Sequence, residues 1–233
     1  CPRLCRVNRE EKPGACGCGA RLFAARAALH FGEEPCISGV EGSGTVFFSG
    51  CNLHCVFCQN HKISRERYGK ELTAARLADI FRELEEKGAN NINLVTPTPW
   101  VTEIIKALQL YRPKVPVLYN TSGYERVEVL RELEGLIDVW LPDYKYADSA
   151  LAARFSGAAD YPAVARAALQ EMYRQSGNLT LNKEGKAVRG VMIRHLVLPL
   201  HLKNSFAVLD DIVALFGTEQ YVSLMFQYTP FIR

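Results

Sequence analysis

The sequence predicts an α/β fold, a partial (β/α)6 barrel with parallel strands, preceded by a cysteine-rich N-terminal extension. Three observations predict it. From about residue 44, short apolar runs rich in β-branched residues alternate with helical patterns. The strand runs are almost continuously apolar, as in parallel sheets that are covered on both faces, and right-handed crossovers would curl such units into an open barrel. All eight cysteines lie at or before residue 58 of the 233, which sets the extension apart.

Composition narrows the classes of function. Hydrophobic residues make up 48% of the chain, which allows a large core and argues against disorder. The net charge of +3 is too small and too dispersed to predict nucleic acid or a membrane as a partner. We find no apolar run long enough to span a bilayer and no signal-peptide pattern, so we expect a cytoplasmic protein.

The extension is expected to have two parts. Residues 1–18 are basic and rich in turns and cysteines, so we expect a loop structure that needs an external staple. Residues 19–31 carry apolar side chains at helical spacing, which predicts a helix. We therefore divide the chain into an extension with its helix, residues 1–40, and a barrel domain, residues 41–233.

The barrel elements follow from changes in hydrophobic period. The run over residues 74–87 is amphipathic at helical spacing, and Gly88 follows as a stop signal. In parallel α/β folds the chemistry collects at the carboxyl ends of the strands. The predicted strands are residues 45–49, 92–95, 115–119, 137–141, 191–198 and 221–226, and the other predicted helices are residues 101–110, 127–134, 151–155, 164–175 and 206–216.

A cysteine triad directly follows the first predicted barrel strand. Cys51, Cys55 and Cys58 have the spacing C-x3-C-x2-C, on a loop where a barrel places its active site. Three thiolates can bind three irons of a [4Fe–4S] cluster and leave the fourth iron without a protein ligand. A zinc site is the weaker alternative, because structural zinc usually takes four ligands and His54 has little chain on either side to wrap one ion. Three unligated thiols packed as small hydrophobes are the remaining alternative.

The segment GCNLHCVFCQN resembles the cluster loop of radical S-adenosylmethionine (SAM) enzymes. Within that superfamily the chain is similar to proteins related to pyruvate formate-lyase-activating enzyme, from about residue 44 to the end. The segments CPRLC and EEPCISGVEGSGTVFFSGC resemble a less characterised branch of that group.

The resemblance implies two cofactors and a reaction. A [4Fe–4S] cluster on the three cysteines would bind SAM through its amino nitrogen and carboxylate at the open iron. The reduced cluster would pass an electron into the sulfonium, giving methionine and a 5′-deoxyadenosyl radical that abstracts a hydrogen atom. The implied partners are a reductant such as flavodoxin or ferredoxin and a protein, peptide or small-molecule substrate.

The resemblance also points to SAM-binding residues at the strand ends. Relatives commonly carry Gly-Gly-Glu after the second strand, whereas this chain has Thr96-Pro97-Thr98-Pro99, which can accept hydrogen bonds from an amino group or form only a rigid turn. Asp143 and Lys145 share one side of an extended segment and can contact an amino acid moiety or pair with each other. The expected SAM-binding residues are Phe57, Asn60, Thr96, Thr98, Asn120, Ser122, Asp143, Lys145, Arg194, His201 and Gln227.

Two further groups of residues lie outside the barrel strands. Four thiolates satisfy either an iron–sulfur cluster or zinc, so Cys1, Cys5, Cys16 and Cys18 are a possible second metal site; alternatively only some of them are structural. His30, Glu33, Glu34 and Cys36 would line the substrate site if their linker folds over the barrel mouth, or they are a solvated helix end.

Three functions fit the sequence. The first is an activase that generates a glycyl radical in a partner enzyme. The second is a radical SAM enzyme that acts on a small molecule or another peptide. The third, a non-catalytic iron–sulfur or zinc protein, would not need Asp143, Lys145 and Arg194 at strand ends.

Overall fold

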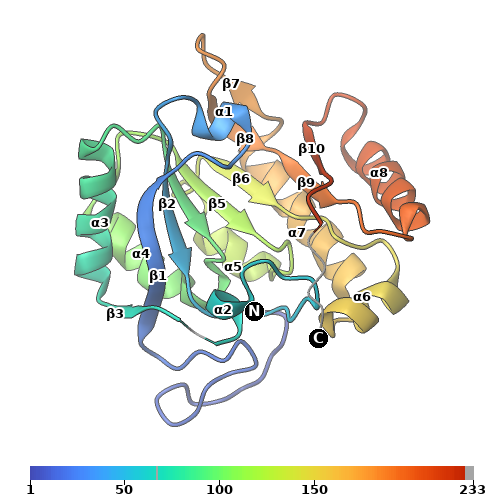
Figure 1. The fold of residues 1–233 in the computed structure, drawn as a ribbon, viewed down its shortest axis with the longest axis horizontal. Coiled ribbons are helices and arrows are strands. Elements are labelled where there is room, and N and C mark those ends of the chain that lie inside the picture. Colours follow the sequence, from blue (N-terminus) through green and yellow to red (C-terminus); the bar gives the residue numbers. More distant parts are fainter. Residues whose placement is uncertain (67, 229–233) are drawn as a thin grey trace.

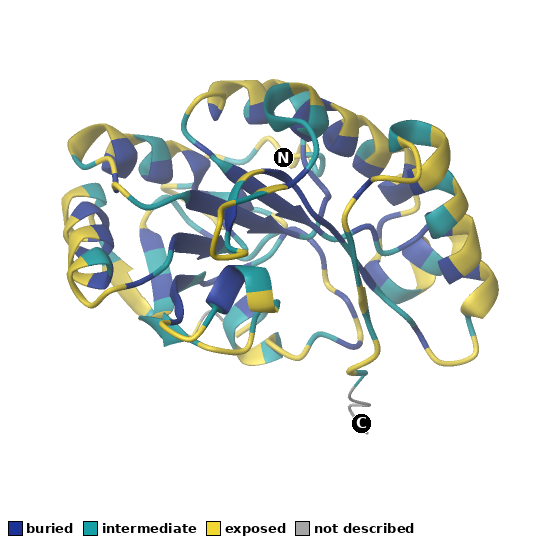
Figure 2. Cartoon of the chain, turned by 90° about the horizontal axis from the view of Figure 1, so that it is seen from above, coloured by how far each residue is buried: buried dark blue, intermediate teal, exposed yellow. Residues whose placement is uncertain are grey.

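The computed structural model describes residues 1–66 and 68–228, and its centre is a curved, mostly parallel sheet (Figure 1). Strands β2 (Ser43–Phe48), β4 (Ile92–Val95), β5 (Val117–Thr121) and β6 (Val139–Pro142) lie side by side in parallel. Each is separated from the next by a helical crossover, as the alternation of sequence periods predicts. Figure 2 shows the helices on the outside of the curve, with their buried residues toward the sheet.

The fifth predicted strand, residues 191–198, is present as the shorter β9 (Ile193–Leu196), and a strand that was not predicted, β8 (Ala187–Val191), directly precedes it. β8 pairs in parallel with β6, and β9 pairs in parallel with β10 (Val222–Met225). The Tyr144 N–H donates to the Arg194 carbonyl at 2.8 Å, so β9 still lies against the end of β6. The predicted parallel partial barrel is therefore confirmed, with a kink in its fifth strand.

The helices that cover the sheet match the predicted ones to within a few residues at each end. α3 shows why: the Thr73 side chain accepts from the Arg76 N–H at its start, and Leu77, Phe81 and Leu84 are buried along one face. A second cap begins α6, where Asp148 accepts from two N–H groups of the first turn. The covering helices are α3 (Ala74–Glu86), α4 (Val101–Leu110), α5 (Val127–Glu132), α6 (Ser149–Ser156), α7 (Tyr161–Ser176) and α8 (Leu202–Phe216).

The predicted helix over residues 19–31 is wrong. These residues form strand β1 (Leu22–His30), which pairs antiparallel with β2 and with the short β3 (Lys70–Leu72). Local alanine-rich periodicity favours a helix, but the free edge of β2 offers a ladder of backbone hydrogen bonds, and such tertiary context overrides propensity. β1 belongs to the same sheet as the barrel strands, and the division at residue 40 stays a prediction.

Of the four residues expected near the substrate site, His30 and Glu33 line the cavity at the carboxyl ends of the strands, and Glu34 and Cys36 do not. The linker after β1 itself does not cross the barrel mouth. It forms the short helix α1 (Pro35–Ser38), which lies at the amino ends of the strands, opposite the cysteine loop (Figure 1). Ile37 of α1 is fully buried in a small apolar cluster with Leu118, Val139 and Leu141 inside the barrel. The linker therefore closes the bottom of the barrel, because the Ile37 side chain is buried there. None of the helices within residues 1–66 and 68–228 has the length and hydropathy needed to cross a membrane.

Candidate active site

A cavity of about 530 Å³ opens at the carboxyl ends of the barrel strands. The three cysteines of the predicted cluster loop line it. So do nine of the eleven residues expected to bind SAM, because the parallel strands deliver their loops to one edge of the sheet. These nine are Phe57, Asn60, Thr96, Asn120, Ser122, Asp143, Lys145, Arg194 and Gln227.

The cysteine loop is held in place by contacts at its start and in its middle. It begins at Gly50, which has φ +84° and approaches Cys18 so closely that a Cβ would lie 2.0 Å from the Cys18 sulfur. Asn52 Nδ2 donates to the Tyr124 carbonyl at 2.6 Å, and Arg65 donates to the Cys55 carbonyl at 2.9 Å. The loop is thus held against the cavity without help from a metal ligand.

Each sulfur of the triad has a neighbouring hydrogen-bonding group. The Leu53 N–H donates to Cys51 Sγ at 3.4 Å, and Ser156 Oγ donates to Cys55 Sγ at 3.0 Å. Ser64 Oγ lies 3.4 Å from Cys58 Sγ. Hydrogen bonds to sulfur are one of the levers that tune iron–sulfur clusters.

The donor set fits a [4Fe–4S] cluster. Burial, followed by the nearby Cys55, raises the pKa of Cys51 to about 12, and burial also raises the pKa of Cys55. Such thiols ionise when a metal replaces their protons. In residues 1–66 and 68–228, no three His, Cys, Asp or Glu side chains converge as a single ion requires. A cluster binds each thiolate at a separate iron, so it does not need that convergence.

A buried ionic network forms one side of the cavity. Asp143 pairs with Lys145 at 2.5 Å and with Arg194 at 3.2 Å. Arg194 also pairs with Glu33 at 3.0 Å and lies 3.9 Å from Glu34. Burial pushes the pKa of Asp143 upward, but the two cations outweigh it and hold that pKa below its ordinary value. Asp143 and Lys145 therefore pair with each other and line the cavity at the same time.

Two residues expected to bind SAM lie elsewhere. His201 begins α8 and packs its ring against Phe155, with the ring centroids 5.2 Å apart, away from the cavity. Thr98 is buried in a short 3₁₀ turn (Thr98–Trp100) and donates to Glu125 Oε1 at 2.5 Å. The neighbouring Thr96, with φ +58°, turns toward the cavity instead.

Glu125 is a buried acid that sequence reasoning missed, because it follows a turn where a solvated carboxylate is ordinary. It is 1% exposed, and Oε1 accepts from Thr98 and Thr121, each at 2.5 Å. Its Oε2 has no hydrogen-bond partner among residues 1–66 and 68–228. Burial raises the pKa of Glu125 to about 7, against three hydroxyl hydrogen bonds that lower it. Glu125 thus ties together the ends of β4 and β5 that face the cavity.

This raised pKa predicts a pH-dependent stability. Glu125 holds its proton more tightly in the folded protein than in the unfolded chain. Its contribution to the free energy of unfolding is therefore complete below the ordinary Glu pKa. It is lost as the pH rises to about 7. The loss is roughly 3 kcal/mol, from about 1.4 kcal/mol per pKa unit. Glu125→Gln should remove this dependence in urea unfolding at pH 5 and pH 8, and an equal dependence in both proteins would contradict it.

The other histidine of the fifth strand behaves as a packing residue. His195 is fully buried, and its ring nitrogens contact the Tyr144 carbonyl at 2.7 Å and Ser205 Oγ at 2.9 Å. Alternation along β9 sends His195 away from the cavity and Arg194 into it. The two neighbours therefore point in opposite directions, with Arg194 lining the cavity and His195 in the core.

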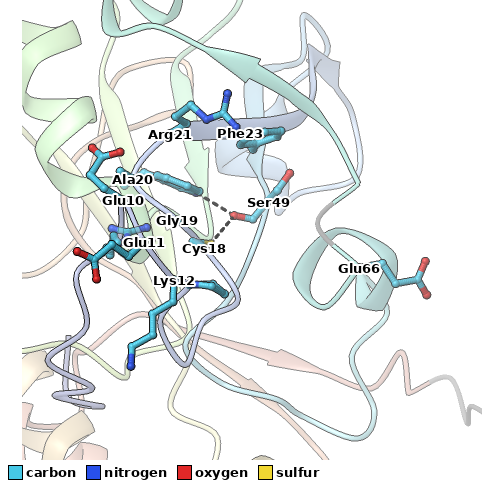
Figure 3. A pocket seen from close by; sticks show the side chains of 13 residues that line it. Glu10, Glu11, Lys12, Cys18, Gly19, Ala20, Arg21, Phe23, Ser49 and Glu66 are labelled. Atoms are coloured by element: carbon cyan, nitrogen blue, oxygen red, sulfur yellow. Dashed lines mark hydrogen bonds between the residues drawn. The ribbon is translucent and has the colours of Figure 1, made fainter.

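A separate pocket of about 440 Å³ lies beside the end of β2, and of the four N-terminal cysteines only Cys18 lines it (Figure 3). Cys18 and Trp100 both donate to the Ser49 carbonyl, at 3.6 Å and 2.8 Å. A hydrogen bond with Cys18 lowers the pKa of Cys16 to about 6, although burial opposes the shift. Cys1 and Cys5 are exposed. The loop thus packs behind the cluster loop, and a second cluster or a zinc ion stays a prediction.

A partial parallel barrel with a three-cysteine loop at its carboxyl edge defines a class of cluster-binding enzyme folds. The family model of the Radical SAM superfamily matches residues 45–168. The chain belongs to the radical SAM superfamily.

Individual relatives agree with this assignment. "Uncharacterized protein MJ0674" of Methanocaldococcus jannaschii is 31% identical over 239 residues, which cover 99% of this chain and 65% of that protein. The solved structure of Streptococcus suis SuiB bound to S-adenosylmethionine has a TM-score of 0.54 at 14% identity, over 75% of this chain and 37% of SuiB. The FeFe-hydrogenase maturase HydG of Carboxydothermus hydrogenoformans has a TM-score of 0.50 at 14% identity, over 75% of this chain and 42% of HydG. The chain thus spans less than two thirds of each of these proteins, and the two structures support the fold. The narrower likeness to pyruvate formate-lyase-activating enzyme stays a prediction.

Proposed function

We propose that this chain carries the catalytic barrel of a radical SAM enzyme, with a [4Fe–4S] cluster on Cys51, Cys55 and Cys58. One observation carries the proposal: the three thiols and the polar groups of the strand ends line a single cavity. A structural zinc or electron-transfer site needs no such set of uncharged and charged groups beside it. The non-catalytic alternative is therefore not favoured.

The residues of this chain have distinct tasks in the proposed site. Lys145 and Arg194 can donate hydrogen bonds to the carboxylate of SAM, and Asp143 can accept from its amino group. Ser122 lines the cavity, and its buried Oγ has no hydrogen-bond partner among residues 1–66 and 68–228, so a ligand hydroxyl would satisfy it. Phe57 offers a ring to the adenine. When bound and reduced, the cluster supplies the electron that cleaves SAM.

The substrate and the reductant are also proposals. A flavodoxin or ferredoxin would supply electrons, and the substrate would be a protein, peptide or small molecule. SuiB has been solved with its precursor peptide SuiA, which makes a peptide one reasonable class. A glycyl radical enzyme as the partner has no specific observation in its favour.

Product analysis tests this function. The anaerobically reconstituted chain, reduced with dithionite and given SAM, should release 5′-deoxyadenosine and methionine in equal amounts. Chromatography with mass detection measures both. If a protein with a full cluster forms no 5′-deoxyadenosine, the proposed function is wrong.

A further inference from the structure

The cavity extends beyond the strand ends to a wall formed by β1 and β2. Arg26 and His30 of β1 and Phe47 of β2 line this part. The His30 and Phe47 rings meet edge to face, with centroids 5.6 Å apart. β1 is an added antiparallel strand outside the parallel barrel, so this wall lies to one side of the groups assigned above to SAM.

A β-bulge turns Arg26 toward the cavity. Ala24 pairs with Phe48 of β2, but Arg26 pairs with Phe47, so the register shifts by one residue between them. Without the shift, alternation would place Arg26 on the same face as Ala24, which is buried in the core under the helices. Bulges re-aim side chains in this way and are frequent beside active sites.

Arg26 is the cation in this cavity whose charge is not already balanced. Lys145 and Arg194 are both held by Asp143, and Arg194 also by Glu33. The Arg26 side chain is exposed and makes no hydrogen bond or ion pair among residues 1–66 and 68–228. An arginine turned into a cavity by a bulge, beside two rings, is arranged to meet an anion.

We propose that Arg26 binds the carboxylate of the substrate, and that His30 and Phe47 contact an adjoining flat apolar group. This inference rests on the proposed function, because it places the substrate next to SAM. A guanidinium fork matches a carboxylate in a bidentate manner. A singly charged carboxylate suits the wall better than a doubly charged phosphate, since Glu33 also lines the cavity and would repel the extra charge.

Binding of a probe pair tests the assignment. Benzoate and its uncharged analogue benzamide would be titrated by calorimetry into the reconstituted protein with SAM present, and inorganic phosphate would be the third arm. We expect benzoate to bind more tightly than benzamide and phosphate. Arg26→Gln should raise the Kd for benzoate about ten-fold and Arg26→Lys by less, because one charge-assisted contact is lost or weakened.

Arg189→Gln is the matched control, because Arg189 is an exposed arginine on strand β8 far from this wall. Its Kd for benzoate should equal that of the wild type. The inference is overturned if benzamide or phosphate binds as tightly as benzoate, or if Arg26→Gln leaves the Kd unchanged. A failure of the proposed function can be told apart from a failure of this inference. If the proposed function is wrong, the wild type forms no 5′-deoxyadenosine, whatever the result of the benzoate titration.

Discussion

Cys55→Ala should lose the iron–sulfur cluster and, with it, all measurable cleavage of SAM. Cys55 is the most buried residue of the triad, at 9% exposed, and no other described cysteine lines the cavity to replace it beyond Cys51 and Cys58. Changes in the outer shell of a metal site already cost 10- to 100-fold, so removal of a ligand should cost more than about 100-fold. Iron and sulfide content per chain and the rate of 5′-deoxyadenosine formation measure the effect.

Cys36→Ala serves as the matched control. Cys36 lies in α1 at the opposite end of the barrel, and burial raises the pKa of its thiol. This variant should keep the wild-type iron content and rate. A Cys55→Ala protein with full iron content would show that the triad does not hold the cluster.

Asp143→Asn should destabilise the fold more than any surface substitution. It keeps the shape of the side chain but leaves Lys145 and Arg194 without their shared carboxylate, although both have side chains at most 15% exposed. Removing one partner of a buried ion pair costs about 3–5 kcal/mol. Urea unfolding at pH 7 measures the loss, and Glu83→Gln, which breaks the exposed pair with Arg76, should leave the midpoint nearly unchanged.

The difference in stability between the wild type and Asp143→Asn should depend on pH in one defined direction. Because the cations hold the pKa of Asp143 below its ordinary value, its stabilisation is present above the unfolded pKa of about 4. It is lost as the pH falls through the lowered value in the folded protein. The gap between wild type and Asp143→Asn should therefore shrink on acidification. Equal midpoints at pH 7 would contradict a stabilising network.

Much of the fold could be predicted because its signals are local. Helix α3 and strand β4 are defined by their own periodicity and flanking residues, and the cysteine triad by spacing and position after a strand. Strand β1 could not be predicted, because the strand with which it pairs lies further along the chain and the spacing of its own apolar residues is typical of a helix. The short helix α1 was not predicted for the same reason. Its Ile37 is buried only because it packs against residues inside the barrel that come later in the sequence.

The site was predicted where residues follow strand ends, and missed where contacts are distant in sequence. Glu33 meets Arg194 across 161 positions of the chain, so no local pattern links them. Arg26 reaches the cavity only through a register shift between β1 and β2. Glu125 was missed because its burial depends on hydroxyls from two strand ends.

We infer that the cluster has one iron without a protein ligand and that SAM binds to it at the strand ends. Electron paramagnetic resonance tests this central claim most directly. The anaerobically reconstituted protein is reduced with dithionite, and its spectrum is recorded without and with SAM. We expect SAM to change the spectrum of the reduced cluster, because three thiolates leave one iron free to take a new ligand. A spectrum that stays the same at saturating SAM would contradict an open iron in this cavity.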